Sequence, residues 1–184
     1  MISKITKVFT ITLIIFIFFT CSNANAQSTS KSNFRFGIGV DGLVPLSSFR
    51  STVNYALGIT PRLQYTLNND VAFTFTTGYY HFFTKPLYIP AGEFGAGERI
   101  QNDLDIIPIK IGAKYFVSSN FYLAGEAGLG LEVDNGGGDS KLILSPGIGY
   151  ANKRWDIAIR YENFRGQNYN YSTAGLRVAY GFGL

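Results

Sequence analysis

Charged residues, cysteine and histidine are scarce in this chain of 184 residues. Asp, Glu, Lys and Arg make up 15% of it, against roughly 25% in a typical soluble domain. One cysteine excludes a disulfide scaffold and a cysteine-rich zinc site, and one histidine leaves little for histidine-based metal or triad chemistry. The composition therefore predicts a non-enzymatic protein with no cofactor and no bound metal.

Glycine and apolar side chains are abundant instead. The 21 glycines and the 46% of hydrophobic residues are spread along the sequence without a low-complexity run, so the chain is expected to fold rather than stay disordered. Lysine and arginine outnumber Asp and Glu by only 16 to 12. This small excess gives no indication of a nucleic-acid partner.

The start of the chain has the layout of a secretory signal peptide. Lysines precede a short apolar run, and small residues end the segment at Ala26. The run is shorter than the roughly 20 residues that a membrane-spanning helix needs. We therefore expect residues 1–26 to be removed after export, residues 27–33 to form a short lead, and residues 34–184 to fold as one domain. Lipidation of Cys21 stays open as an alternative, although the bulky residues before it are atypical of a lipoprotein signal.

After the lead, large apolar residues alternate with small or polar ones. In the last segment, Leu176–Leu184, every even-numbered residue is large and apolar, and every odd-numbered one is Gly, Ala or Arg. A period of two is typical of β-strands whose two faces meet different surroundings. The same rule finds eight such segments along the chain.

The connections between these segments are alternately short and long. The short turns lie at 68–70, 118–120 and 152–153, and the longer loops at 43–54, 84–103, 134–141 and 165–171. Short turns at one end and long loops at the other, with an even number of strands, are typical of outer-membrane barrels. The sequence thus predicts an all-β fold, an eight-stranded antiparallel up-and-down transmembrane β-barrel.

Nearly all strand charges fall on the face that carries glycine. The interior of an eight-stranded barrel is only just wide enough for side chains, so we expect the bulky apolar face to meet lipid and the charged face to line the lumen. The expected lumen charges are Arg35, Asp41, Arg62, Lys110, Lys114, Glu126, Glu132, Asp156, Arg160, Glu162 and Arg177.

Six of these lumen charges are basic and five acidic, and this near balance favours a network of ion pairs that plugs the lumen. If the turn at 118–120 sets the register, Gly112 lies opposite Glu126, and Lys110 and Lys114 bracket that carboxylate on the diagonals. The alternative is a narrow pore for small solutes or ions, lined by the same side chains.

Aromatic residues are grouped by height along the strands. Most of them lie near the short turns, and a few lie toward the loops, with Ile, Leu and Val between the two groups. Such groups are typical of interfacial girdles. The girdle at the turn end is expected to contain Tyr65, Tyr115, Phe121, Tyr150, Trp155, Tyr180 and Phe182.

The opening Phe36–Val40, the segment Ile107–Phe116 and the closing aromatic strand resemble small outer-membrane β-barrel families, the OmpX/OmpA-like and PorT-like proteins. The resemblance covers nearly all of the chain after the signal. It implies location in the cell outer membrane, with outer-membrane lipid and the barrel-insertion machinery as partners. It also implies a role among adhesins, surface-protective proteins and secretion accessories. One departure is the terminal Leu184, where an aromatic residue is usual.

Three segments have a partial likeness to chemical motifs. Gly37–Gly42 matches a dinucleotide-binding fingerprint by letter, but no helix follows it. His81 is interpreted as a rim histidine, and its use as a base toward Ser47 or Ser172 in a lipid-modifying enzyme lacks a supporting motif. Asp134–Asp139 has oxygen ligands without the spacing of a calcium loop.

The external loops are the remaining candidates for function. The loop at 84–103 and the tyrosines near 170 present aromatic and amide groups suited to contact with an extracellular protein or glycan. The contact candidates are Tyr88, Phe94, Tyr169 and Tyr171. The sequence therefore favours a structural or surface-interaction role, in adhesion, protection or as an accessory protein.

Overall fold

The computed structural model describes residues 33–89, 98–100, 103–133, 139–166 and 169–183. The expected signal peptide, its cleavage and Cys21 lie outside the described residues, as do Phe94 and Leu184. Among the described residues, no helix has the length and apolar character needed to cross a membrane.

Strands dominate the described part of the chain. They alternate in direction and are joined by the expected turns, with one short 3-10 helix, η1 (Ser47–Ser51). The strands are β1 (Phe34–Leu46), β2 (Val53–Thr66), β3 (Val71–Thr77), β4 (Tyr79–Thr84), β5 (Leu87–Ile89), β6 (Glu98–Ile100), β7 (Leu104–Phe116), β8 (Phe121–Glu132), β9 (Ser140–Ala151), β10 (Trp155–Arg165) and β11 (Asn170–Gly183).

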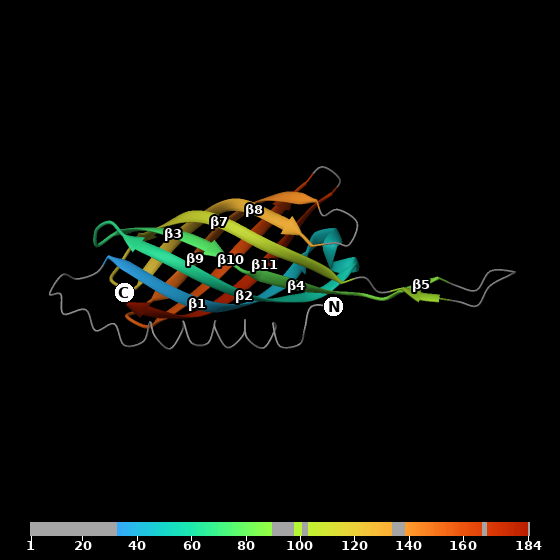
Figure 1. The fold of residues 1–184 in the computed structure, drawn as a ribbon, viewed down its shortest axis with the longest axis horizontal. Coiled ribbons are helices and arrows are strands. Elements are labelled where there is room, and N and C mark those ends of the chain that lie inside the picture. The colour runs from blue at the N-terminus through green and yellow to red at the C-terminus, as the bar shows by residue number, and fades with distance from the viewer. Residues whose placement is uncertain (1–32, 90–97, 101–102, 134–138, 167–168, 184) are drawn as a thin grey trace, which may run out of the picture. The chain divides into compact units, whose positions relative to one another are not determined.

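The main sheet closes on itself (Figure 1). Strands β7 to β11 pair in chain order, and β1 pairs with both β11 and β2. Strands β3 and β4 both pair with β2 and β7, so they act as one strand that is interrupted at Gly78. The result is a closed barrel of eight antiparallel strands, which confirms the predicted fold class. Strands β5 and β6 form a separate ladder.

The interruption at Gly78 has a steric cause. This residue has a φ of 158°, and a Cβ built on it would lie 2.8 Å from Cγ2 of Thr60 in the neighbouring strand. Only a glycine lets the chain pass this close while the pairing with β2 shifts from one half of the strand to the other.

The strand register agrees with the expectation from the turns. Val117 N donates to Phe121 O at 2.9 Å, and Gly112 lies opposite Glu126. Two of the expected loops are shorter than predicted, because strand pairing continues into them: Leu46 still pairs with Ser172, and Ser140 with Leu131.

The distribution of side chains is inside out relative to a soluble protein. Ile59 and Ile111 on the outer face are 62% and 66% exposed, whereas Asp41 and Lys110 on the inner face are fully buried. Soluble proteins bury charged residues rarely and only when these are paired. This sidedness is the one expected for a barrel surrounded by hydrocarbon.

Candidate functional site

The middle of the lumen is filled by ion pairs that reach across the bore. Lys110 Nζ lies 2.6 Å from Glu162 Oε1 and 3.3 Å from Glu126 Oε2. Arg62 pairs with Glu126, and Arg160 pairs with Asp41. We call these six residues the central ion network, and they come from β1, β2, β7, β8 and β10.

Lys114 has a different partner from the one that its register suggested. It was expected to bracket Glu126 together with Lys110, but its ammonium group pairs with Asp156 in β10. The Tyr122 hydroxyl donates to the same carboxylate, and Lys114 Nζ lies 4.3 Å from the centroid of the Tyr122 ring. The register places both lysines on the diagonals from Glu126, as predicted, but of the two only Lys110 pairs with that carboxylate. A long lysine side chain can cross the bore as easily as it can reach along its own wall.

Arg177 and Arg35 differ from the other lumen cations. Arg177 is fully buried, and its guanidinium donates to the hydroxyl of Thr60 at 2.5 Å and to the backbone O of Thr60 at 3.0 Å. Arg35, at the turn end, donates to the backbone O of Asn152 at 2.9 Å. Among the described residues, neither arginine has a carboxylate oxygen within 4.0 Å.

Glu132 pairs with a cation that the sequence analysis assigned to a loop. Lys141 is fully buried, and its Nζ lies 3.3 Å from Glu132 Oε1 and 4.0 Å from the centroid of the Tyr169 ring. Lys141 belongs to β9, so it shares the inward parity of Ile143 and Ser145. In this alternating strand the odd-numbered residues 141, 143 and 145 point inward, and this parity could have predicted that Lys141 lies in the lumen.

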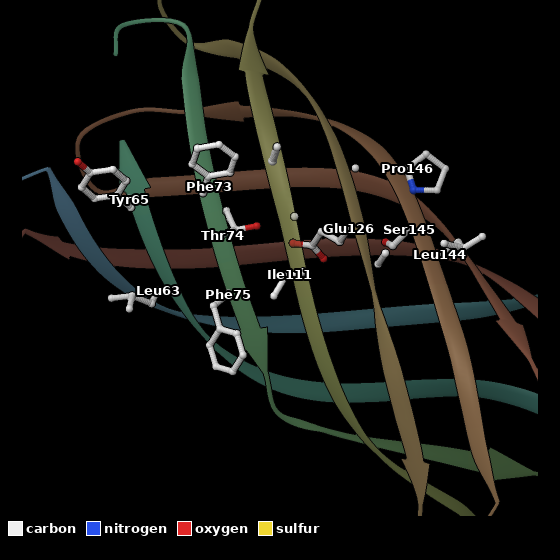
Figure 2. A pocket seen from close by; sticks show the side chains of 14 residues that line it. Leu63, Tyr65, Phe73, Thr74, Phe75, Ile111, Glu126, Leu144, Ser145 and Pro146 are labelled. Carbon is white, nitrogen blue, oxygen red and sulfur yellow. The ribbon is translucent and has the colours of Figure 1, made fainter. Parts of the chain in front are cut away.

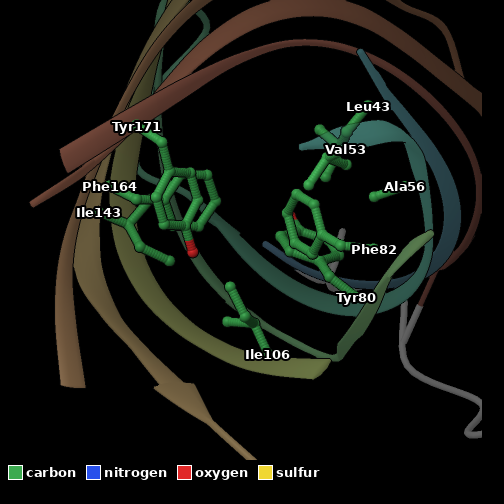
Figure 3. Close-up of a cluster of buried hydrophobic side chains, with 9 residues drawn as sticks. All are labelled: Leu43, Val53, Ala56, Tyr80, Phe82, Ile106, Ile143, Phe164 and Tyr171. Carbon is green, nitrogen blue, oxygen red and sulfur yellow. The ribbon is translucent and has the colours of Figure 1, made fainter. Parts of the chain in front are cut away.

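Toward the loops, the lumen holds a cluster of apolar side chains beside the Lys141–Glu132 ion pair. Nine buried side chains point into the bore from opposite walls (Figure 3). We call them the loop-end cluster: Leu43, Val53, Ala56, Tyr80, Phe82, Ile106, Ile143, Phe164 and Tyr171. The expectation of a small-or-polar interior was wrong here.

Particular glycines make room for the aromatic rings inside. A Cβ on Gly58 would lie 2.8 Å from Cε1 of Tyr80, which is its partner in the opposite strand. Gly149 stands opposite Tyr122 in the same way. The Tyr80 hydroxyl also accepts from Lys110 Nζ at 3.2 Å, so this ring joins the loop-end cluster to the central ion network.

Of the four residues expected to contact an external partner, Tyr171 points into the lumen instead. It is 4% exposed and stacks on Phe164, with ring centroids 4.8 Å apart. The expectation that it contacts a partner is wrong, because β11 begins at Asn170 and its alternation turns Tyr171 inward. Tyr169 is 50% exposed. Tyr88 lies in β5, and Phe94 is outside the described residues.

The girdle residues cluster near the turns, as their positions in the strands require. Phe121 lies opposite Tyr150, with ring centroids 5.2 Å apart, and Trp155 lies opposite Tyr180, with ring centroids 5.3 Å apart. Phe182 continues this group, with its ring 4.9 Å from Tyr180. Tyr65 and Tyr115 flank β3 on its two sides, opposite Phe73 and Val71 respectively.

His81 lies on the outer face near the loops. Its Nδ1 is 2.5 Å from Asp105 Oδ1, and its Nε2 is 3.6 Å from Asp103 Oδ2. Ser172 is on β11, where its hydroxyl bonds to Tyr161 and Asn163 instead. The strand order places β2 and β1 between β4 and β11, so the structure does not bring the histidine and this serine together.

An open apolar hollow of about 760 Å³ indents the outer face over β2, β3, β7, β8 and β9 (Figure 2). Its floor is formed by small outward-facing residues, Ala113, Gly125 and Ala127. Phe73 and Phe75 of β3 form one of its walls. In this part of the wall, lipid tails would reach the backbone of the barrel.

Solved structures of outer-membrane barrels share this fold. The attachment invasion locus protein Ail of Yersinia pestis superimposes with a TM-score of 0.56 at 15% identity, over 82% of this chain and 99% of that chain. The structure of Ail in a phospholipid bilayer nanodisc superimposes with a TM-score of 0.52 at 14% identity, over 80% of this chain and 99% of that chain. Neisserial surface protein A superimposes with a TM-score of 0.50 at 20% identity, over 83% of this chain and 98% of that chain.

This chain has the fold of the small outer-membrane β-barrels. The structural likeness agrees with the OmpX/OmpA-like resemblance, and at these identities it establishes the fold alone. The sequence matches no protein-family model and no curated protein.

Proposed function

We propose that the protein is exported, loses residues 1–26, and is inserted in the outer membrane as a non-conducting barrel that acts through its external end. The observation that carries this proposal is the filled lumen. The central ion network occupies the middle of the bore, and the loop-end cluster occupies the part next to the loops. An ion that crossed the barrel would have to displace both.

The outer surface supports the location. Exposed Ile, Leu and Val side chains surround the barrel between the aromatic groups, and this is the surface that an outer membrane covers. The lipid partners include an acyl chain in the outer hollow, whose lining is almost wholly apolar. Insertion uses the barrel-insertion machinery.

The external end supports a surface-interaction role rather than an enzymatic one. Lys85 Nζ donates to the backbone O of Arg50 at 2.7 Å, which holds two exposed cationic residues side by side. Tyr169 adds an exposed aromatic ring at the same end of the barrel. Cationic and aromatic groups together suit an extracellular protein or glycan that carries acidic groups.

Conductance and surface binding test the two halves of the proposal separately. The purified barrel in a planar bilayer is expected to give no current steps, and regular steps would make it a narrow pore instead. Liposomes that carry the barrel are expected to retain an acidic glycan such as heparin. This retention should fall in the double variant Arg50→Gln/Lys85→Gln and persist in the control Lys153→Gln/Arg154→Gln at the turn end.

A further inference from the structure

At the turn end of the lumen lies a small cavity that we call the turn-end cavity. Its volume is about 20 Å³, and the charged and amide side chains that line it are Arg35, Arg62, Gln64, Asp156 and Arg177. Three guanidinium groups therefore face one carboxylate. We propose that this cavity is a binding site for a single small anion of the halide class, such as chloride.

The one carboxylate of the cavity is already engaged. Asp156 pairs with Lys114 and accepts from the Tyr122 hydroxyl, and its distance to the nearest Arg62 nitrogen is 3.9 Å. Arg62 makes its closer contact with Glu126 in the central ion network. Among the described residues, Asp156 therefore forms no ion pair with Arg35 or Arg177. Arg177 lies opposite Asp41 in the neighbouring strand and reaches that carboxylate only through the Thr60 hydroxyl.

Two N–H groups on these arginines are buried without an acceptor in the described residues. They are Nε of Arg177 and Nη2 of Arg35, one on each of two guanidinium groups that line the cavity. A buried, charged donor without a partner is strongly unfavourable. Both arginines do have other contacts, to Thr60 and to Asn152, so the side chains are held while these two donors remain available.

Charge in this region cannot be removed by deprotonation, because arginine keeps its proton in proteins. The buried set of the described residues contains Arg62, Lys110, Lys114, Lys141, Arg160 and Arg177 on the cationic side. On the anionic side it contains Asp41, Glu126, Asp156 and Glu162. Lys141 is neutralised by Glu132 at the loop end, so five cations stand against four carboxylates in the rest of this buried set. A bound anion supplies the missing negative charge where the two donors without an acceptor lie.

The size of the cavity selects the ligand. About 10–15 Å³ is enough for one water-sized occupant, so a cavity of about 20 Å³ fits a monatomic anion better than the larger phosphate or sulfate. Glycine at two positions keeps this space open. Gly37 and Gly181 both line the cavity, and a Cβ on Gly181 would clash with Nη2 of Arg35. The bond from Arg35 to Asn152, an exposed turn residue, places the entrance at the turn end.

The test is chloride-35 nuclear magnetic resonance on the folded protein in detergent micelles prepared with gluconate as the only other anion. Specific binding is expected to broaden the chloride line, and bromide should reverse the broadening while sulfate at equal ionic strength does not. In Arg35→Gln, which keeps a donor for the Asn152 carbonyl, chloride affinity is expected to fall by about tenfold through loss of one charged contact.

The matched control is Arg165→Gln, an exposed arginine at the loop end, which is expected to bind chloride as the unaltered protein does. Crystals grown in sodium bromide are expected to show an anomalous peak within hydrogen-bonding distance of Arg177 Nε. The proposal is overturned if the broadening is equal in Arg35→Gln and the unaltered protein, if sulfate competes as well as bromide, or if only water occupies the cavity. Conductance and glycan binding play no part in these readouts.

Discussion

Lys110 and Glu162 meet across the bore of the barrel, with the ammonium nitrogen 2.6 Å from a carboxylate oxygen. Two whole strands, β8 and β9, separate their own strands in the sheet. The pair therefore ties together parts of the wall that are not neighbours, whereas the backbone ladders of the described strands join neighbouring strands. Contacts of this kind hold a closed sheet in one cross-sectional shape.

Removal of the Glu162 charge is expected to destabilise the barrel strongly. Glu162→Gln leaves the ammonium of Lys110 and the guanidinium of Arg160 without their shared carboxylate, at a cost of about 3–5 kcal/mol. Urea unfolding in lipid vesicles, followed by the fluorescence of the single tryptophan, Trp155, measures it. The double variant Glu162→Gln/Lys110→Met should be more stable than Glu162→Gln alone. If the loss of stability in the double variant equals the sum of the losses in Glu162→Gln and Lys110→Met, the two side chains are not coupled.

A charge on the outer face tests the lipid contact. Ile109→Arg, at mid-height on the outside of β7, should lower the free energy of unfolding by about 2–4 kcal/mol, because the guanidinium would sit in hydrocarbon. Val117→Arg, also exposed but at the turn, should cost about 0–1 kcal/mol. Equal costs at the two heights would contradict a bilayer around the barrel.

Two glycines of β8 provide a matched test of packing inside and outside. A Cβ on Gly128 would lie 2.6 Å from the Cα of Lys110, whereas one on Gly125 would have no atom within 4 Å. Gly128→Ala is expected to cost about 1–3 kcal/mol by overpacking, and Gly125→Ala to stay within about 0.5 kcal/mol of the unaltered protein. The same unfolding assay measures both costs. A larger cost for Gly125→Ala than for Gly128→Ala would contradict the assignment of the inner and outer faces.

The two neighbouring tyrosines of the last loop should separate stability from binding. Tyr171→Ala removes a buried ring from the loop-end cluster and is expected to cost about 3–5 kcal/mol. Tyr169→Ala gives up an exposed ring over the Lys141 ammonium, worth about 1 kcal/mol or less. Glycan retention by liposomes should fall with Tyr169→Ala. If Tyr169→Ala destabilises the protein as much as Tyr171→Ala does, Tyr169 is not an exposed contact residue.

Much of the barrel follows from local pattern. A period of two fixes which face each strand residue occupies, and the turn formers at 118–120 fix the register that puts Gly112 opposite Glu126. For these features, neighbours in sequence or in the adjacent strand are enough. The lumen position of Lys141 follows from the same rule once the start of β9 is known.

The pairing inside the bore does not follow from local pattern. Which charges meet depends on how far each strand is staggered when the sheet closes, because stagger sets the height at which opposite walls face each other. Closure brings Lys114 to Asp156 rather than to Glu126, and it brings Tyr80 into the space that Gly58 leaves. The sequence by itself determined the two faces of the wall, whereas only the tertiary structure decided what fills the space within it.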